Sequence, residues 1–163
     1  MDFEKFTDRS RGFIQSAQSL ALRSDHQQLT ALHLLKVMLD DREGFAANLI
    51  EQSGGRPADV LSDTEIQLEK LPKVAGGGAG QLYVDADFAK IIASAEDVSK
   101  KSGDSYVTIE QLLLAMALAT GSSAGIILKK GGVTPQNLNQ AIESFRKGRK
   151  ATSSNAEDSY DAL

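Results

Sequence analysis

Few side chains in this chain could carry out catalysis or hold a metal, and the two histidines are the first candidates. His26 lies in a polar stretch and His33 lies between two leucines, so no His-x-x-x-His pair is present to bind zinc. The sequence contains no cysteine, which excludes a thiolate nucleophile, a disulfide framework and a cysteine-based zinc site. We therefore interpret both histidines as structural residues, at the surface or partly buried.

Three other patterns resemble functional motifs. The glycine-rich stretch 76–80 is not followed by Lys-Ser or Lys-Thr, which a phosphate-binding loop requires. Asp85 begins a pattern like a calcium loop, but Lys90 stands at the sixth position, where such a loop needs glycine. The basic run 146–150 suits a solvated helix end better than nucleic acid. With a net charge of −4 as well, we expect a protein-binding module with no nucleic-acid or membrane partner.

The elements that would position a binding site form an internal duplication. The segment Thr30–Met38 (TALHLLKVM) recurs 78 residues later as Thr108–Met116 (TIEQLLLAM), and Pro57 recurs as Pro135. The register holds without a gap, which indicates one supersecondary unit repeated twice. Two copies are too few for a solenoid, so we expect a pseudo-twofold globule with one shared core.

Apolar residues recur at helical spacing in both copies, and no stretch resembles a convincing strand. The expected N-terminal caps and first-turn prolines are Thr7, Thr30, Pro57, Asp85, Thr108 and Pro135. Thr108 and Gln111 form a Thr-x-x-Gln capping box. The predicted fold class is all-α, a pseudo-twofold duplication of a four-helix repeat with about eight helices.

The predicted organisation is one domain, residues 1–147, followed by a linker. Repeat one spans about 4–71 and repeat two about 82–147. Residues 72–81 (PKVAGGGAGQ) between them are poor in apolar side chains, and we expect a flexible loop there. Residues 148–163 are polar without apolar periodicity, which predicts a linker toward a further domain. The N-terminus has no signal-peptide core, and no apolar run approaches the roughly 20 residues that span a bilayer.

Short segments throughout the chain resemble the Clp family of AAA+ ATPases, in which the duplicated unit is the Clp N-terminal repeat. The opening segments that carry the resemblance are 1–7 (MDFEKFT), 17–22 (AQSLAL) and 32–35 (LHLL). The segments 71–76 (LPKVAG) and 101–107 (KSGDSYV) are more similar to the ClpB disaggregases than to the Clp unfoldases that feed a protease. The resemblance covers the whole chain and implies a first ATPase module beyond its last residue.

For the complete protein, the resemblance implies a cytoplasmic homohexamer that rescues aggregated protein after heat stress together with the DnaK system. This chain would be its mobile N-terminal domain, which binds aggregated or unfolded polypeptides and passes them to the ATPase pore. It would hold no metal or cofactor, and ATP would bind to the missing ATPase domains. A stand-alone adaptor or peptide-binding module with the same repeat and no ATPase is the alternative interpretation.

The resemblance also implies candidate substrate-binding residues. They are a polar cluster of Thr7, Asp104 and Glu110, and an apolar groove with Ile92 and Val98. Each polar residue also has a structural interpretation. Thr7 would be a helix cap and Asp104 a turn former. A carboxylate in the first turn of a helix, as expected for Glu110, contributes about 0.3–1 kcal/mol through the helix dipole.

Overall fold

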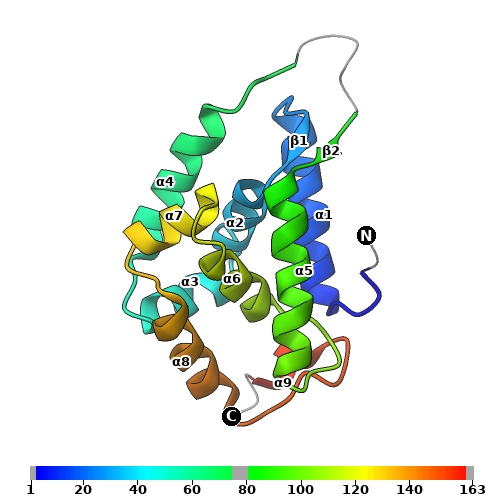
Figure 1. Ribbon diagram of the computed structural model, residues 1–163, viewed down its shortest axis with the longest axis vertical. Coiled ribbons are helices and arrows are strands. Elements are labelled where there is room, and N and C mark those ends of the chain that lie inside the picture. Colours follow the sequence, from blue (N-terminus) through cyan, green and yellow to red (C-terminus); the bar gives the residue numbers. More distant parts are fainter. Residues whose placement is uncertain (1–2, 75–80, 161–163) are drawn as a thin grey trace.

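The computed structural model describes residues 3–74 and 81–160 and confirms the duplicated all-α fold (Figure 1). Repeat one contains α1 (Asp8–Arg23), β1 (Gln28–Leu29), α2 (Ala31–Leu39), α3 (Phe45–Gln52) and α4 (Pro57–Glu69). Repeat two contains β2 (Tyr83–Val84), α5 (Ala86–Lys101), α6 (Ile109–Leu118), α7 (Ser123–Lys130) and α8 (Pro135–Arg146), and α9 (Ala156–Tyr160) follows it. Most of the predicted loop, residues 75–80, lies outside the described residues.

Three of the four pairs of equivalent helices begin with the predicted caps or prolines, whereas α3 follows Gly44 without a side-chain cap and α7 is capped by Ser122. α1 and α5 follow Thr7 and Asp85, whose side chains accept a hydrogen bond from the backbone amide three residues later. α2 and α6 follow Thr30 and Thr108, which form capping boxes. In the first of these boxes the residue that closes the motif is His33. α4 and α8 begin with the predicted prolines.

Two short parallel backbone pairings join the repeats. Leu29 pairs with Val84 in the two-stranded sheet of β1 and β2, and Phe6 pairs with Val107 in an isolated bridge. Phe6 and Val84 stand at equivalent positions of the two repeats, 78 residues apart, and so do Leu29 and Val107. The two pairings are therefore equivalent to each other in the duplicated fold. The start of α1 is thereby held beside the start of α6, and the start of α5 beside that of α2. Such short pairings leave no alternating pattern from which they could be predicted.

The centre of the fold is formed by α2 and α6, with α1 packed against α2 and α5 packed against α6 (Figure 1). Every residue from Ile109 to Ala117 in α6 is buried. A helix that is apolar on all sides has to be covered on all sides, which explains its place in the core. Two of the buried α6 residues, Glu110 and Gln111, are polar and therefore need partners inside the protein.

The segment after Gly148 differs from the predicted linker, because it packs against the rest of the chain. Ala151 is fully buried, and α9 buries three of its five residues. The Tyr160 ring contacts the Phe145 ring edge-on, with 5.7 Å between centroids. Only isolated residues of this segment are buried, so the sequence shows no periodic pattern. We call residues 149–160 the C-terminal segment.

Among the described residues, no single helix is long and apolar enough to cross a membrane. Only α6 and α7 taken together meet the requirements of length and composition, and this pair is bent by 93° at its break.

Candidate functional site

A buried polar cluster lies at the N-terminal end of α6, around the guanidinium group of Arg146. The Arg146 side chain is 8% exposed. Its Nε donates to Glu110 Oε2 at 2.7 Å, and its Nη1 donates to Asp104 Oδ2 at 2.7 Å. Its Nη2 donates to the Thr108 hydroxyl at 3.1 Å. The cation from α8 is thus held by two carboxylates and a helix cap from the region where α6 begins.

Glu110 and Asp104 balance the charge of Arg146 in this interior. Glu110 is 1% exposed, and the Asp104 side chain is fully buried. Burial alone would lower the pKa of Arg146, but the two carboxylates raise it. Breaking a buried ion pair leaves an uncompensated charge, so each member of the pair depends on the other.

Glu157 from α9 completes the cluster. Its Oε2 accepts a 2.6 Å hydrogen bond from the Thr7 hydroxyl and a 3.1 Å hydrogen bond from the Ile109 backbone amide. The carboxyl group therefore lies at the N-terminus of α6, where the helix dipole favours negative charge. Burial raises the pKa of Glu157, and the charge of Glu110 raises it further. We call Thr7, Asp104, Thr108, Glu110, Arg146 and Glu157 the polar cluster.

Backbone hydrogen bonds fasten the C-terminal segment over the polar cluster. The Asp8 amide donates to the Ser154 carbonyl at 2.7 Å, and the Ser105 amide donates to the Ala151 carbonyl at 2.8 Å. The Ala151 amide donates to Asp104 Oδ1 at 2.9 Å. These contacts join the segment to both repeats, at the start of α1 and in the loop before α6.

The structure brings Thr7, Asp104 and Glu110 together, although they come from different parts of the chain. All three side chains are buried and satisfied by partners within the protein, apart from Glu110 Oε1, which has no hydrogen-bond partner among the described residues. Thr7 also fulfils its predicted role as a helix cap. Of the two predicted apolar residues, Ile92 is 2% exposed and belongs to the core, whereas Val98 is partly exposed.

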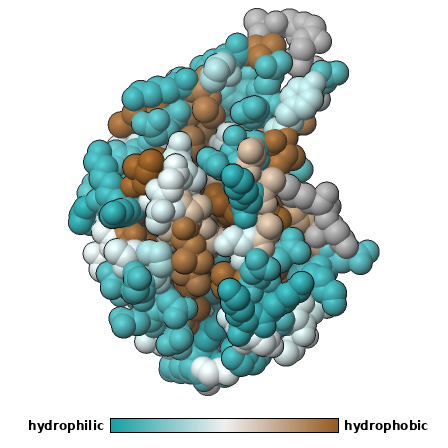
Figure 2. Space-filling model, in the orientation of Figure 1, coloured by the Kyte–Doolittle hydropathy of each residue, from teal (hydrophilic) through white to brown (hydrophobic). Residues whose placement is uncertain are grey.

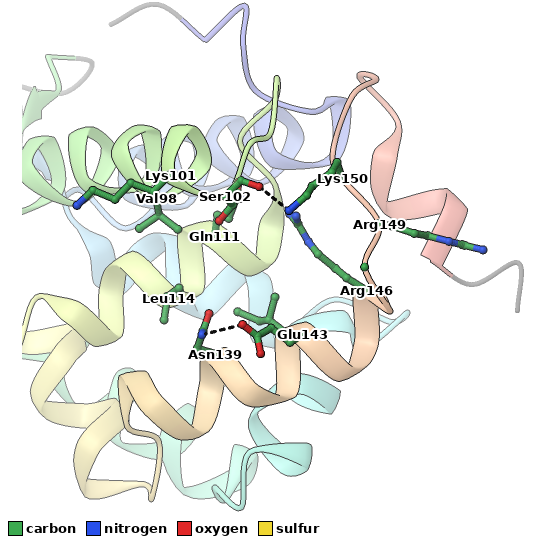
Figure 3. Close-up of a pocket in the computed structure, with 12 residues that line it drawn as sticks. Val98, Lys101, Ser102, Gln111, Leu114, Asn139, Glu143, Arg146, Arg149 and Lys150 are labelled. Atoms are coloured by element: carbon green, nitrogen blue, oxygen red, sulfur yellow. Dashed lines mark hydrogen bonds between the residues drawn. The ribbon is translucent and has the colours of Figure 1, made fainter.

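Beside the polar cluster, a groove of about 600 Å³ lies between α5, α6 and α8 (Figure 3). Its apolar part is formed by Val98, Leu114 and Ile142, one from each helix. Its polar lining includes Lys101, Ser102, Gln111, Asn139, Glu143, Arg146 and Lys150. Figure 2 shows apolar atoms over α6 in the middle of this face, with hydrophilic atoms on both sides. Arg146 thus belongs to both the groove and the polar cluster.

Sequence reasoning singled out Val98 in this groove but not Leu114 or Ile142. Those two belong to the hydrophobic core, with exposures of 8% and 6%, and only their edges reach the groove between α6 and α8. Gln111 contributes its amide to the polar cluster. Its Nε2 donates to Asp104, while its Oε1 accepts from the Thr108 backbone amide at 3.1 Å.

The two histidines are both buried and contact each other. His26 Nδ1 lies 2.8 Å from His33 Nε2, and His33 Nδ1 accepts a 3.0 Å hydrogen bond from the Thr30 backbone amide. Burial and, to a smaller extent, the neighbouring His26 lower the pKa of His33 to about 4. Their contacts are structural, in the capping box of α2. Residues 3–74 and 81–160 contain no group of three or more histidine or carboxylate side chains placed to hold a metal ion.

The buried His33 is expected to destabilise the domain in acid. The unfolded chain takes up the proton below about pH 6.5, whereas folded His33 does so only near pH 4, so stability falls as the pH falls through this range. The loss from this residue amounts to up to about 3 kcal/mol. His33→Gln should keep the cap, because Gln111 closes the equivalent box in α6. Urea unfolding between pH 7 and 4 should show a shallower loss in this variant. Equal losses in both proteins would contradict this account of His33.

Comparisons with known proteins agree with this architecture. Residues 5–130 match the family described as the Clp repeat (R) N-terminal domain. Over all 163 residues the chain is 56% identical to the chaperone protein ClpB of Rhodopseudomonas palustris and 52% identical to that of Rhizobium meliloti. It spans 18% and 19% of these two proteins, less than a fifth of their length.

Solved structures show the same fold at lower sequence identity. The Hsp104 N-terminal domain from Candida albicans superposes with a TM-score of 0.81 at 22% identity, over 94% of this chain and 99% of that one. The N-domain of ClpV from Vibrio cholerae gives a TM-score of 0.71 at 18% identity, over 93% and 90% of the two chains. Together with the match over residues 5–130, the duplicated helical repeat shows that this chain belongs to the family of Clp repeat N-terminal domains.

Proposed function

We propose that this chain is the substrate-engaging N-terminal domain of a ClpB-type protein disaggregase, and that the groove between α5, α6 and α8 binds unfolded polypeptide. The observation that carries the proposal is the apolar part of the groove, formed by Val98, Leu114 and Ile142 within a polar surround. Unfolded and aggregated proteins expose apolar segments, and an exposed apolar surface rimmed by polar residues suits their capture. The contact should be weak, because ordering a flexible chain offsets much of the gain from burial.

The proposal extends to the complete protein. The similarity to proteins named chaperone protein ClpB supports an AAA+ ATPase outside this segment, where ATP would bind. On the family resemblance we further propose a cytoplasmic homohexamer that acts with the DnaK system. In that assembly this domain would bind aggregated or unfolded polypeptides and pass them to the pore, while the ATPase domains perform the work.

For Thr7, Asp104 and Glu110 we propose a role that depends on the C-terminal segment. While residues 149–160 pack against them, Asp104 and Glu110 hold the side chain of Arg146 at the wall of the groove, and Thr7 donates to Glu157 of the segment. The three residues would touch substrate only if the segment moved away. Substitutions of Asp104 or Glu110 would therefore change binding through Arg146 even when the segment stays in place, whereas a substitution of Thr7 would act through Glu157.

The experiment is a calorimetric titration of the chain with a permanently unfolded protein, carboxymethylated α-lactalbumin. We expect saturable binding that Val98→Asp weakens about tenfold or more, because burying one apolar side chain contributes about 1.5–3 kcal/mol. Ile66→Asp is the matched control, since Ile66 is 49% exposed on α4 and does not line the groove. Circular dichroism should show both variants folded. Unchanged binding by folded Val98→Asp, or equal loss in the control, would rule out the groove as the site.

A further inference from the structure

Two basic stretches far apart in the sequence contribute lysines to the rim of one groove, with the Lys150 side chain reaching Ser102 and the Lys101 side chain extending the opposite way along α5 (Figure 3). Lys101 is the last residue of α5, and Lys150 follows α8, yet both line the same opening (Figure 3). Lys150 Nζ donates to the Ser102 carbonyl at 2.8 Å, which fastens the two stretches together. The run 146–150 is therefore more than a solvated helix end, because part of it forms a wall of the groove.

The two lysines add positive charge to this rim that no ion pair among the described residues cancels. Both Lys101 and Lys150 are exposed. The charge of Arg146 is already balanced by Asp104 and Glu110 beneath it. Arg149 also lines the groove, but its guanidinium group points away from it and donates to the Ser159 carbonyl (Figure 3), so its charge is not counted here.

The carboxylate that lines the groove comes from a different wall. Glu143 belongs to α8, where Asn139 donates to it at 3.4 Å (Figure 3). The rim of an apolar groove thus carries two lysines, although the chain as a whole has a net charge of −4. Complementary charges favour correct partners and like charges disfavour wrong ones.

We infer that the groove prefers apolar polypeptide segments flanked by aspartate or glutamate over the same segments flanked by lysine or arginine. This inference rests on the proposed function and adds the charge of the preferred substrate. The apolar part would hold the segment, and Lys101 and Lys150 at the rim would attract its acidic flanks. Single-stranded nucleic acid fits less well, because such sites stack bases on aromatic side chains and none of the described residues lining this groove is aromatic.

The test uses three fluorescent peptides with one apolar core, flanked by Asp-Asp, Ser-Ser or Lys-Lys, in anisotropy titrations with the full chain. Exposed charge pairs contribute modestly, so the Asp-flanked peptide should bind about fivefold more tightly than the Lys-flanked one. The preference should shrink when ionic strength rises from about 0.05 M to 0.2 M. The double variant Lys101→Glu, Lys150→Glu should abolish or reverse the preference. The control Lys90→Glu, Lys100→Glu makes the same change in net charge at exposed α5 positions outside the groove lining and should keep it.

The outcomes separate this inference from the proposed function. Equal binding of all three peptides, or a preference that survives the double variant, would overturn the charge preference and leave groove binding intact. Absence of binding by every peptide and by carboxymethylated α-lactalbumin would overturn the proposed function itself. Displacement of the Asp-flanked peptide by a lower concentration of single-stranded oligonucleotide than of unlabelled peptide would assign the surface to nucleic acid and overturn the inference.

Discussion

Replacement of Arg146 by alanine is expected to lower the free energy of unfolding by about 3–5 kcal/mol. The substitution leaves Glu110 and Asp104 in the interior without the cation that compensates them, and Thr108 loses a hydrogen-bond donor. In a chain of this length the loss corresponds to a fall of about 10 °C or more in Tm. Urea unfolding followed by circular dichroism, together with thermal melting at pH 7, provides the measurement.

Arg11→Ala is the matched control, because Arg11 forms an ion pair of the ordinary surface kind with Asp8. The side chains of Arg11 and Asp8 are both substantially exposed, so we expect the free energy of unfolding to change by less than about 0.5 kcal/mol. A similarly small loss for Arg146→Ala would show that the polar cluster does not support the fold. For Glu110→Ala, which strips Arg146 of one partner, we expect a loss closer to that of Arg146→Ala than to that of a first-turn carboxylate.

Glu157→Ala is expected to release the C-terminal segment and to expose the backbone amides that it covers. The substitution removes the acceptor for both the Thr7 hydroxyl and the Ile109 amide. Leaving buried donors unpaired costs about 1–3 kcal/mol, which should fall on the local opening of this segment. In hydrogen exchange, the amides of Asp8 and Ser105, which donate to carbonyls of the segment, should lose at least about tenfold in protection.

The same experiment contains an internal reference. The Val107 amide donates to the Lys5 carbonyl and should keep its protection, because neither residue belongs to the C-terminal segment. Asp158→Ala serves as the control variant, since Asp158 pairs with Arg9 at a more exposed site. If Glu157→Ala leaves protection at Asp8 and Ser105 unchanged, Glu157 does not fasten the segment. If the Val107 amide loses as much protection as the amides of Asp8 and Ser105, the whole region has unfolded.

The features that the sequence predicts depend on residues only a few positions apart in the chain. Thr7 and Thr108 are recognisable as caps because the hydrogen-bond partner lies three residues away. The duplication is visible because both copies keep the same helical pattern. The partners of buried polar groups are a different matter. Arg146 lies 36 residues from Glu110, and Glu157 lies 150 residues from Thr7, so no local pattern connects them.

A sequence signal for the polar cluster does exist in α6. Glu110 stands at the start of a helix that is apolar from Leu112 to Leu118, and a carboxylate in such a helix has to find a partner. The sequence does not say which cation supplies it. The C-terminal segment is harder to predict, because its buried residues are too few to form a pattern among its polar ones. Its packing depends on groups that only the folded domain brings together.

The most direct test of groove binding is an NMR titration of the isotope-labelled chain with carboxymethylated α-lactalbumin. The account predicts saturable shift changes that are largest at the amides and methyl groups of Val98, Leu114 and Ile142. They should be small in residues 57–69 of α4, which do not line the groove. The shift changes should also weaken in Val98→Asp. Largest changes on α4, or no saturable change at protein concentrations that allow weak binding, would contradict the claim that this groove receives unfolded polypeptide.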